Sequence, residues 1–326
     1  MIDTDALSAQ LRRESVDVSN QRLLVSRLAG SDQEPDLSEP VNCDGLGRIR
    51  HFHATTPAPW PANPLPWLPA RRHLGADAVP DEGAQAQVFQ NAACNWRCWY
   101  CFVPFNLLRA DPGRSEWVSA EDLVEKYLAL PKRPAILDLS GGQPDLVPEW
   151  AVWTLRALID RGVDTTTFLW SDDNLSNDYL FRYLSNDDIE LLAHHPAYGR
   201  VGCLKGFDRD SFAFNTAAAP VLFERQLELV NRLVERFPNL YLYVTLTAPE
   251  IPRDADATLI RLLSTLADIN AGLPARTVPL QVTTFTPTLP RMRPEHRAAL
   301  KVQTEMVYRW NSLLPQFADV PTQGSA

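Results

Sequence analysis

The sequence predicts an α/β protein with a partial (β/α)6 TIM-like barrel and an N-terminal Pro-rich extension. Two observations lead to this fold class. From about residue 86 onward, short runs rich in β-branched and aromatic residues alternate with longer amphipathic stretches. Before that point, the stretch TTPAPWPANPLPWLPA places six prolines between Pro57 and Pro69, which disfavours helices and central strands alike.

Six runs qualify as strands, with helical patterns between them. They are AQVFQN (86–91), AILDLS (135–140), TTTFLW (165–170), RVGCLK (200–205), LYLYVTL (240–246) and LQVTTFT (280–286). This alternation predicts a parallel sheet with right-handed crossovers. Six units are too few to close an eight-stranded barrel, so we expect an open one whose chemistry gathers at the carboxyl ends of the strands.

Two of the helical patterns carry end signals. SAEDLVEKYLAL opens with Ser119 as N-cap and Asp122 at the capping-box position, and VPEWAVWTLRALIDRG closes on Gly162. The predicted organisation is an N-terminal extension over residues 1–85, a core domain over 86–314 and a flexible tail over 315–326. The Pro-rich segment is either an extended strap packed on the core, which its tryptophans and leucines favour, or a disordered linker.

Composition and charge restrict the class of protein. The net charge of −9 and the pI near 5.2 argue against a large nucleic-acid surface, which would need clustered Lys and Arg. No stretch approaches the roughly 18 apolar residues of a membrane span, and the N-terminus lacks the apolar core of a signal peptide. We therefore expect a cytoplasmic protein that does not contact membranes.

Cysteine spacing gives the sharpest indication of function. Cys94, Cys98 and Cys101 form a C-x3-C-x2-C triplet directly after the first strand candidate. Three thiolates in one loop can bind three irons of a cubane cluster and leave the fourth iron without a protein ligand. Zinc is the competing interpretation, although closed zinc sites usually take four ligands. The third alternative is three buried cysteines without a ligand role.

This triplet, with Tyr100 before its last cysteine, resembles the radical S-adenosylmethionine (radical SAM) signature, over about residues 86–290. The resemblance implies a [4Fe-4S] cluster whose open iron binds S-adenosylmethionine (SAM). It also implies that an electron from a donor such as flavodoxin or ferredoxin cleaves SAM to methionine and a 5′-deoxyadenosyl radical, which abstracts a hydrogen from an unactivated carbon. The residue that matches Tyr100 lies near the adenine in that family.

The end of the second strand candidate carries adjacent glycines in DLSGGQPDL. Adjacent glycines let the backbone approach a ligand closely, although Gly-Gly-x-Pro also forms an ordinary turn. The segment resembles the Gly-Gly-Glu-Pro motif of the family, whose backbone binds the methionyl ammonium group. The resemblance therefore implies SAM contacts from Ser140, Gly141, Gly142, Gln143 and Pro144, with Gln143 in place of the usual Glu.

The following strand ends supply further candidates. Ser171 and Asp173 stand where family members often bind the ribose hydroxyls, although such residues also serve as helix N-caps. The segment GCLKGFD resembles the Asp-x-Lys-Gly segment of the glycyl-radical activating enzymes; Lys205 matches the lysine that reaches SAM, and Cys203 replaces the aspartate. Thr245 is a further candidate contact if its face of the fifth strand is polar, but strand propensity explains a threonine there equally well.

Three functions remain open from the sequence. The first is a radical SAM enzyme that acts on a small molecule or nucleoside, with Cys94, Cys98, Cys101 and Lys205 as its catalytic residues. The second is an activating enzyme or maturase for a protein or peptide, which the Lys205 segment and the Trp-rich strap favour. The third is a non-catalytic zinc or electron-transfer module. The sequence does not identify the substrate, because function belongs to the site rather than to the barrel.

Overall fold

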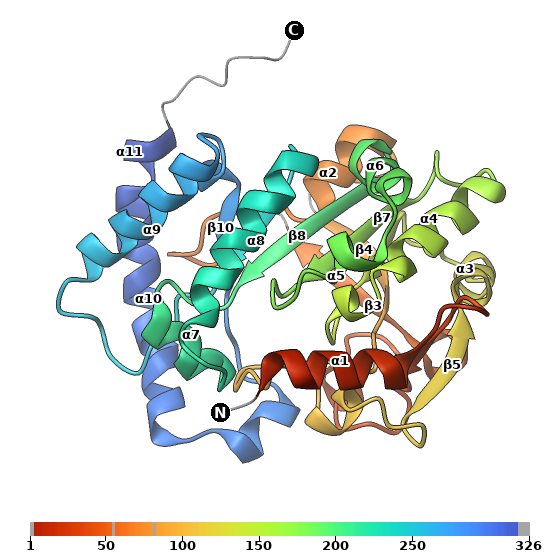
Figure 1. Cartoon of the computed structure of the whole chain (residues 1–326), viewed down its shortest axis with the longest axis horizontal. Coiled ribbons are helices and arrows are strands. Elements are labelled where there is room, and N and C mark those ends of the chain that lie inside the picture. Colours follow the sequence, from red (N-terminus) through yellow and green to blue (C-terminus); the bar gives the residue numbers. More distant parts are fainter. Residues whose placement is uncertain (1–2, 54–55, 81–82, 319–326) are drawn as a thin grey trace, which may run out of the picture.

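The computed structural model describes residues 3–53, 56–80 and 83–318. Its central sheet has seven strands in the order β10-β9-β8-β7-β6-β4-β3. In chain order they are β3 (Gly47–His53), β4 (Gly83–Phe89), β6 (Ile136–Leu139), β7 (Phe168–Asp173), β8 (Tyr198–Leu204), β9 (Tyr241–Val244) and β10 (Thr277–Pro279). Neighbouring strands pair in parallel except β3 and β4, which are antiparallel. The sheet curls into a half-barrel (Figure 1), which confirms the predicted α/β partial barrel.

Helices cover the outer face of this sheet (Figure 1). They are α3 (Ala120–Leu128), α4 (Glu149–Asp160), α5 (Tyr179–Tyr183), α6 (Asn186–His194), α7 (Arg209–Thr216), α8 (Leu222–Arg236), α9 (Ala255–Ile269), α10 (Pro294–Leu313) and α11 (Pro315–Ala318). The predicted N-cap at Ser119 and the glycine stop at Gly162 are confirmed, whereas Asp122 accepts from the Ser119 hydroxyl and does not complete a capping box. The Ser119 side chain accepts a hydrogen bond from the backbone N–H of Asp122 at 3.0 Å, and Gly162 follows α4 with a φ of 63°.

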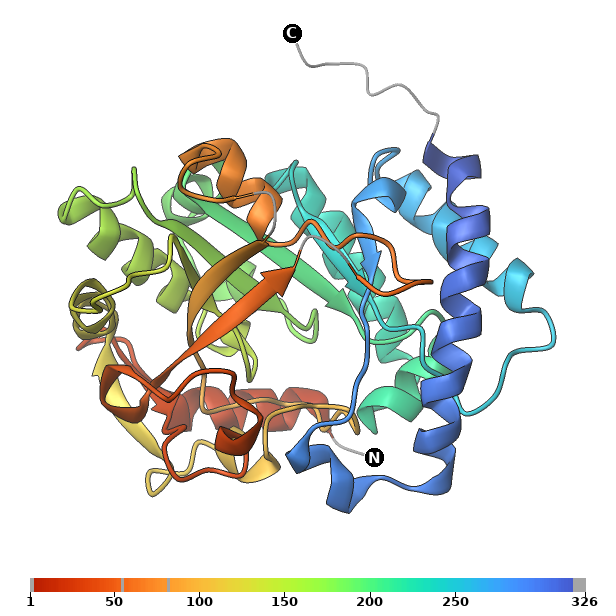
Figure 2. The same cartoon turned by 180° about the vertical axis from the view of Figure 1, so that it is seen from behind.

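The N-terminal region contains more regular structure than the sequence predicted. Helix α1 (Thr4–Ser15) leads into a small antiparallel sheet of β1 (Val16–Asp17), β2 (Arg22–Ser26) and β5 (Ser115–Ser119). Strand β3 then joins the edge of the central sheet beside β4, which Figure 2 shows from behind. The predicted boundary at residue 85 therefore falls inside β4, and β3 pairs with the predicted core although it lies before that boundary.

The Pro-rich segment lies against one end of the half-barrel. Asn63 Nδ2 donates to the hydroxyl of Tyr243 on β9 at 3.1 Å, and Asn311 Nδ2 of α10 donates to the carbonyl of Pro59 at 2.7 Å. The fully buried Leu65 joins an apolar cluster inside the sheet with residues such as Phe168. This end of the half-barrel is thereby filled with side chains, which leaves the opposite end for a site.

Two elements differ from the prediction: a helix forms within the Pro-rich segment, and the last predicted strand is absent. Helix α2 (Trp67–Leu74) forms although prolines were expected to prevent it, because Pro69 falls in the first turn, where no helical hydrogen bond from its nitrogen is needed. The predicted strand 280–286 is wrong. β10 is shorter and ends earlier, since the backbone of Val282 pairs with the Gln303 side chain of α10 (3.1 and 2.7 Å) rather than with a strand.

The C-terminal tail was predicted to be flexible from residue 315. Residues 315–318 instead form α11, and Phe317 packs against the main apolar core. The remainder of the predicted tail, 319–326, lies outside the described residues.

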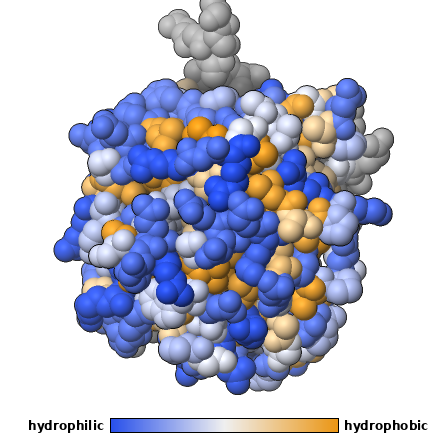
Figure 3. All heavy atoms as spheres, turned by 90° about the vertical axis from the view of Figure 1, so that its right-hand side faces the viewer, coloured by the Kyte–Doolittle hydropathy of each residue, from blue (hydrophilic) through white to orange (hydrophobic). Residues whose placement is uncertain are grey.

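The surface of the molecule mixes polar and apolar side chains. Figure 3 shows one face on which hydrophilic residues dominate and hydrophobic residues form separate small groups. Among the described residues, none of the helices combines the length and the apolar composition that crossing a membrane would require.

Candidate active site

One large cavity lies at the carboxyl ends of the central strands. Its volume is about 830 Å³, within the range of small-ligand sites, about 300–1,000 Å³. The predicted site residues that line it are Cys94, Cys98, Tyr100, Cys101, Ser140, Gly141, Gly142, Gln143, Pro144, Asp173 and Lys205. They come from the loop after β4 and from the ends of β6, β7 and β8. The fold thus gathers segments far apart in sequence at the edge where parallel α/β sheets commonly bind ligands.

Two arginines hold the backbone of the cysteine loop. Arg97 donates to the carbonyl of Cys94, and Arg291 donates to the carbonyls of Trp99, at 3.0 Å, and of Cys101. The three cysteines of the loop are free, and all of them line the cavity. The loop therefore presents three thiols to one space, with its carbonyls already bound.

The thiols and Lys205 influence one another electrostatically. Burial raises the pKa of Cys98 to about 12, against the opposing charge of Lys205, and burial also raises the pKa of Cys101. For Lys205, burial acts to lower its pKa, but the surrounding thiols, Cys203 foremost, and the Tyr100 hydroxyl outweigh burial and raise it. A metal that binds these sulfurs displaces their protons, and the nearby lysine favours the resulting negative charge.

The donor set fits only one of the two kinds of metal site that the sequence left open. Within residues 3–53, 56–80 and 83–318, no group of three or more His, Cys, Asp or Glu side chains could hold a metal ion. The ligands of a cubane cluster surround four irons and therefore stand farther apart than the ligands of a single ion. Three thiols from one loop, all on the cavity wall, are the donor set that such a cluster takes.

The Gly-Gly turn packs directly on the chain that leads into the cysteines. Gly141 and Gly142 have φ values of 90° and 67°, where side chains are strained. A Cβ on Gly142 would lie 2.3 Å from the carbonyl oxygen of Asn91 and 2.6 Å from that of Ala93. The backbone N–H of Gln143 also donates to the Ala93 carbonyl at 2.7 Å. The turn and the cysteine loop consequently form one unit that only glycine permits.

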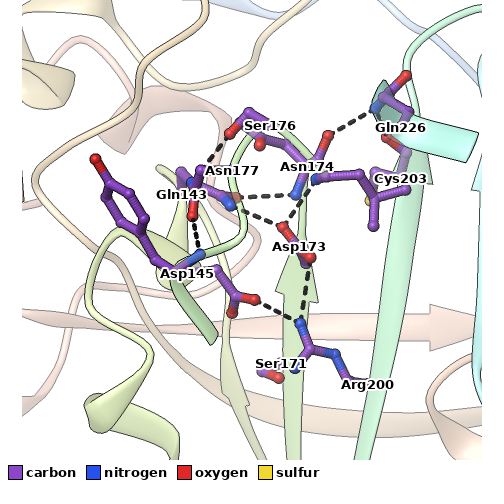
Figure 4. Close-up of polar contacts among 12 residues, drawn as sticks. Gln143, Asp145, Ser171, Asp173, Asn174, Ser176, Asn177, Arg200, Cys203 and Gln226 are labelled. Carbon is purple, nitrogen blue, oxygen red and sulfur yellow. Dashed lines mark hydrogen bonds and ion pairs between the residues drawn. The ribbon is translucent and has the colours of Figure 1, made fainter. Parts of the chain in front are cut away.

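Gln143 connects this turn to the end of β7 (Figure 4). Its Nε2 donates to Asp173 Oδ1 at 2.7 Å, and its Oε1 accepts from the backbone N–H of Asn174 at 2.9 Å. An amide can donate and accept at the same time, whereas an ionised carboxylate only accepts. This geometry explains why glutamine stands where the family motif has glutamate, since a glutamate would repel Asp173.

A buried ion cluster lies behind the turn. Arg200 Nη2 contacts Asp145 Oδ2 at 2.6 Å and Asp173 Oδ2 at 3.3 Å, as Figure 4 shows. Burial raises the pKa of Asp145 to about 7, although Arg200 acts to lower it. Nothing in the sequence pattern indicated this cluster, because Asp145 and Arg200 lie 55 positions apart. Its effect is to hold Asp173, and through it Gln143, in place.

Two predicted residues do not line the cavity. The Ser171 hydroxyl bonds to the hydroxyl of Tyr198 at 2.7 Å, and the cavity is lined from this strand end by Asp172 and Asp173 instead. Thr245 Oγ1 lies 3.1 Å from the hydroxyl of Tyr100. Thr245 can therefore influence a ligand through Tyr100, and the structure brings Ser171 to no ligand position.

Sequence reasoning missed Arg48, Arg50 and Asp138, and it placed Asp172 at a strand end without selecting it as a site residue. Arg48 and Arg50 of β3 and Asp172 of β7 line the cavity, and Asp138 of β6 pairs with Arg50 at 3.4 Å. The alternation in GRIRHFH could have indicated that Arg48 and Arg50 share one face of a strand. This stretch was not among the six predicted core strands and was expected to be exposed to solvent, so the positions of Arg48 and Arg50 were not considered.

Comparisons with known proteins add a family and two distant structures. The model of the radical SAM superfamily matches residues 91–266, and no curated protein matches the sequence significantly. The crystal structure of Streptococcus suis SuiB bound to S-adenosylmethionine is similar at 16% identity with a TM-score of 0.41, covering 56% of this chain and 37% of that one. A second crystal structure of Streptococcus suis SuiB is similar at 15% identity with a TM-score of 0.39, covering 56% of this chain and 36% of that one. This chain thus spans less than two fifths of the SuiB chain.

Proposed function

Because the chain belongs to the radical SAM superfamily, we propose that Cys94, Cys98 and Cys101 hold a [4Fe-4S] cluster and that SAM binds beside it in the 830 Å³ cavity. Together, when bound, the cluster and SAM supply a 5′-deoxyadenosyl radical that abstracts hydrogen from a substrate. One observation carries the proposal: the three thiols, the Gly-Gly turn and Lys205 line one cavity, although they come from separate strand ends.

Each part of the cavity wall has a role in this proposal. The three cysteines are the metal ligands, and a cubane bound by three thiolates keeps one iron for another ligand. Gly141 and Gly142 allow backbone groups to approach the methionyl end of SAM, since no Cβ intervenes. The cation of Lys205 attracts the SAM carboxylate. Gln143 keeps the turn in position through Asp173 and Asn174.

The substrate that fits this site best is a small molecule or a nucleoside rather than a protein segment. The backbone N–H and hydroxyl of Thr286 donate to the Asp36 carboxylate at 2.8 and 2.9 Å. This contact joins the N-terminal and C-terminal segments that border the cavity, where Asp36 and Phe285 are lining residues. A joined border restricts access for a folded partner more than for a small ligand. The electron donor in the proposal is a small redox protein such as flavodoxin or ferredoxin.

The test is SAM cleavage by anaerobically reconstituted protein. Reduced protein with SAM is expected to bind iron and sulfide and to release 5′-deoxyadenosine. Cys98→Ala is expected to lower that release at least about a hundredfold, because each thiolate is a direct ligand whose loss disrupts the site. Cys43→Ala is the matched control, since Cys43 is a free cysteine that does not line the cavity. Zinc in place of iron, or full release by Cys98→Ala, would overturn the proposal.

A further inference from the structure

A buried arginine lines the cavity from β3, and three strands separate β3 from β8, the strand that Lys205 follows. Arg48 and Arg50 are two residues apart on β3 and therefore point to the same side of the strand, and both line the cavity. Arg48 is only 6% exposed. Its guanidinium carbon lies 5.1 Å from the ring centroid of Phe102, the residue that follows Cys101. The cation thus sits beside the loop that presents the thiols.

Arg48 lacks the partners that its charged neighbours have. Arg50 pairs with Asp138 at 3.4 Å, and Asp172 accepts from Ser140 at 2.7 Å and from Trp170 at 3.2 Å. Among the described residues, no carboxylate or other acceptor forms a hydrogen bond or ion pair with Arg48, and its Nε is buried without a partner. A buried cation without a partner is costly, so an anion that enters the cavity would relieve that cost.

The pKa of Arg48 also reflects its burial and its charged neighbours. Burial, and next the charge of Arg50, lower the pKa of Arg48 to about 10, and the carboxylates of Asp138 and Asp172 offset this only in part. The side chain still carries its charge at neutral pH. The guanidinium of Arg48 therefore stays charged at this wall although, among the described residues, no carboxylate pairs with it directly.

We propose that Arg48 binds an anionic group of the substrate, a carboxylate or a phosphate, so that the substrate is an anionic small molecule. This inference rests on the proposed radical SAM function. A guanidinium presents paired N–H donors that match both anions. We assign the anionic group at Arg48 to the substrate rather than to SAM because Arg48 and Lys205 lie far apart in the sheet order. Arg48 is on β3 and Lys205 follows β8, and the strands β7, β6 and β4 lie between them. Two cationic positions so placed suit two anionic groups, the carboxylate of SAM at Lys205 and an acidic group of the substrate at Arg48.

Aromatic probes suit the surroundings of Arg48. Phe102 and Phe285 both line the cavity, with ring centroids 6.0 Å apart. Benzoate and phenyl phosphate carry the two candidate anions on one aromatic body, and benzamide is a neutral counterpart of benzoate. Binding of each probe can be measured by calorimetry on reconstituted protein saturated with SAM, for the wild type and for Arg48→Gln.

At least one of the two anions is expected to bind the wild type more tightly than benzamide. Arg48→Gln is expected to weaken that binding about tenfold to a hundredfold, as loss of a hydrogen bond to a charged group does, while iron content and SAM affinity stay unchanged. Arg48→Lys keeps the charge but not the paired donors, so an intermediate loss is expected; it also serves if Arg48→Gln does not fold. Arg27→Gln, at an exposed arginine outside the cavity, is expected to change nothing.

Three results would overturn the inference. The first is that neither anion binds the wild type, and the second is that both bind Arg48→Gln as tightly as the wild type. The third is that Arg48→Gln weakens SAM instead, which would assign the guanidinium to SAM. Release of 5′-deoxyadenosine by the wild type separates the two proposals. Without that release the proposed function fails, and with it any of the three results removes only the role of Arg48.

Discussion

Two clusters border the cavity, and each contains a buried arginine, but the two arginines are paired differently. In the first cluster, Arg200 is 3% exposed and contacts both Asp145 and Asp173. In the second cluster, Arg48 is 6% exposed and sits beside Arg50, Asp138 and Asp172 without pairing with either carboxylate. Burial alone therefore does not distinguish a structural arginine from one that is ready for a ligand; the partners do.

The difference follows from where each cluster lies. The first cluster lies behind the Gly-Gly turn and holds Asp173, which in turn accepts from Gln143. A buried cation with two carboxylates is satisfied, and removing one member leaves an uncompensated charge. The second cluster faces the cavity, where a ligand can supply the missing partner. We expect the first cluster to respond to substitution with a loss of stability, and the second to respond chiefly with a change in binding.

The largest effect is expected for Arg200→Met. Loss of this cation leaves Asp145 and Asp173 buried without a countercharge, which lowers the free energy of unfolding by about 3–5 kcal/mol. Urea unfolding of the purified protein measures the change. Arg27→Met is the control, because Arg27 and its partner Glu116 are both more than 40% exposed and such pairs contribute at most about 1 kcal/mol. A loss below that size for Arg200→Met would mean that the first cluster does not stabilise the fold.

An intermediate effect is expected for Gly142→Ala. The new Cβ would meet two backbone carbonyls, those of Asn91 and Ala93, so the cysteine loop must move. Gly162→Ala is a matched control, since Gly162 has a similar φ of 63° but nothing within 4 Å of an added Cβ. Gly142→Ala is expected to lower the free energy of unfolding by about 1–3 kcal/mol more than Gly162→Ala. It is also expected to reduce iron binding, and equal behaviour of the two variants would contradict the close packing.

The smallest effect concerns the pH dependence of Asp138→Asn in the second cluster. Burial, and next the charge of Asp172, raise the pKa of Asp138 from 3.8 to about 7 in the folded protein. The folded state then binds a proton more tightly than the unfolded state, so this carboxyl contributes stability at low pH that is lost as the pH rises toward 7. Asparagine does not titrate.

The loss of unfolding free energy between pH 5 and pH 8 is therefore expected to be smaller in Asp138→Asn, by about 1 kcal/mol or more. Thermal or urea unfolding at the two pH values measures it. Asp178→Asn, at an exposed carboxylate, is expected to keep the wild-type pH dependence. If Asp138→Asn does the same, Asp138 does not bind a proton in the folded state as described.

The predictable part of the fold is the part that local patterns determine. Apolar periodicity located five of the seven central strands, and the capping residues of α3 and the glycine after α4 marked helix ends correctly. The strand predicted at 280–286 was wrong because the Gln303 side chain, from a helix that follows it, takes over the backbone of Val282. Strand β3 was missed because its charged residues look solvent-exposed until the cavity behind them is known.

In the site, too, local sequence patterns predicted some features and only the fold shows the others. The cysteine triplet and the Gly-Gly turn were found because their residues are adjacent in sequence. Whether a side chain at a strand end reaches the cavity depends on the neighbours that it meets in the fold. Ser171 bonds to Tyr198 and Thr245 to Tyr100, and neither lines the cavity. Local sequence patterns could not single out Arg48, because what distinguishes it is the lack of a hydrogen-bond or ion-pair partner for a buried side chain, and only the folded structure shows that.

The sequence by itself determined the fold class, the three thiols of one loop and the glycines that the turn requires, because spacing and backbone freedom are local properties. The tertiary structure decided which charges are paired. Arg200 meets two carboxylates from other strands, whereas Arg48 meets an open cavity. Electrostatic pairing depends on distance in space rather than on distance along the chain, and only the folded chain defines those distances.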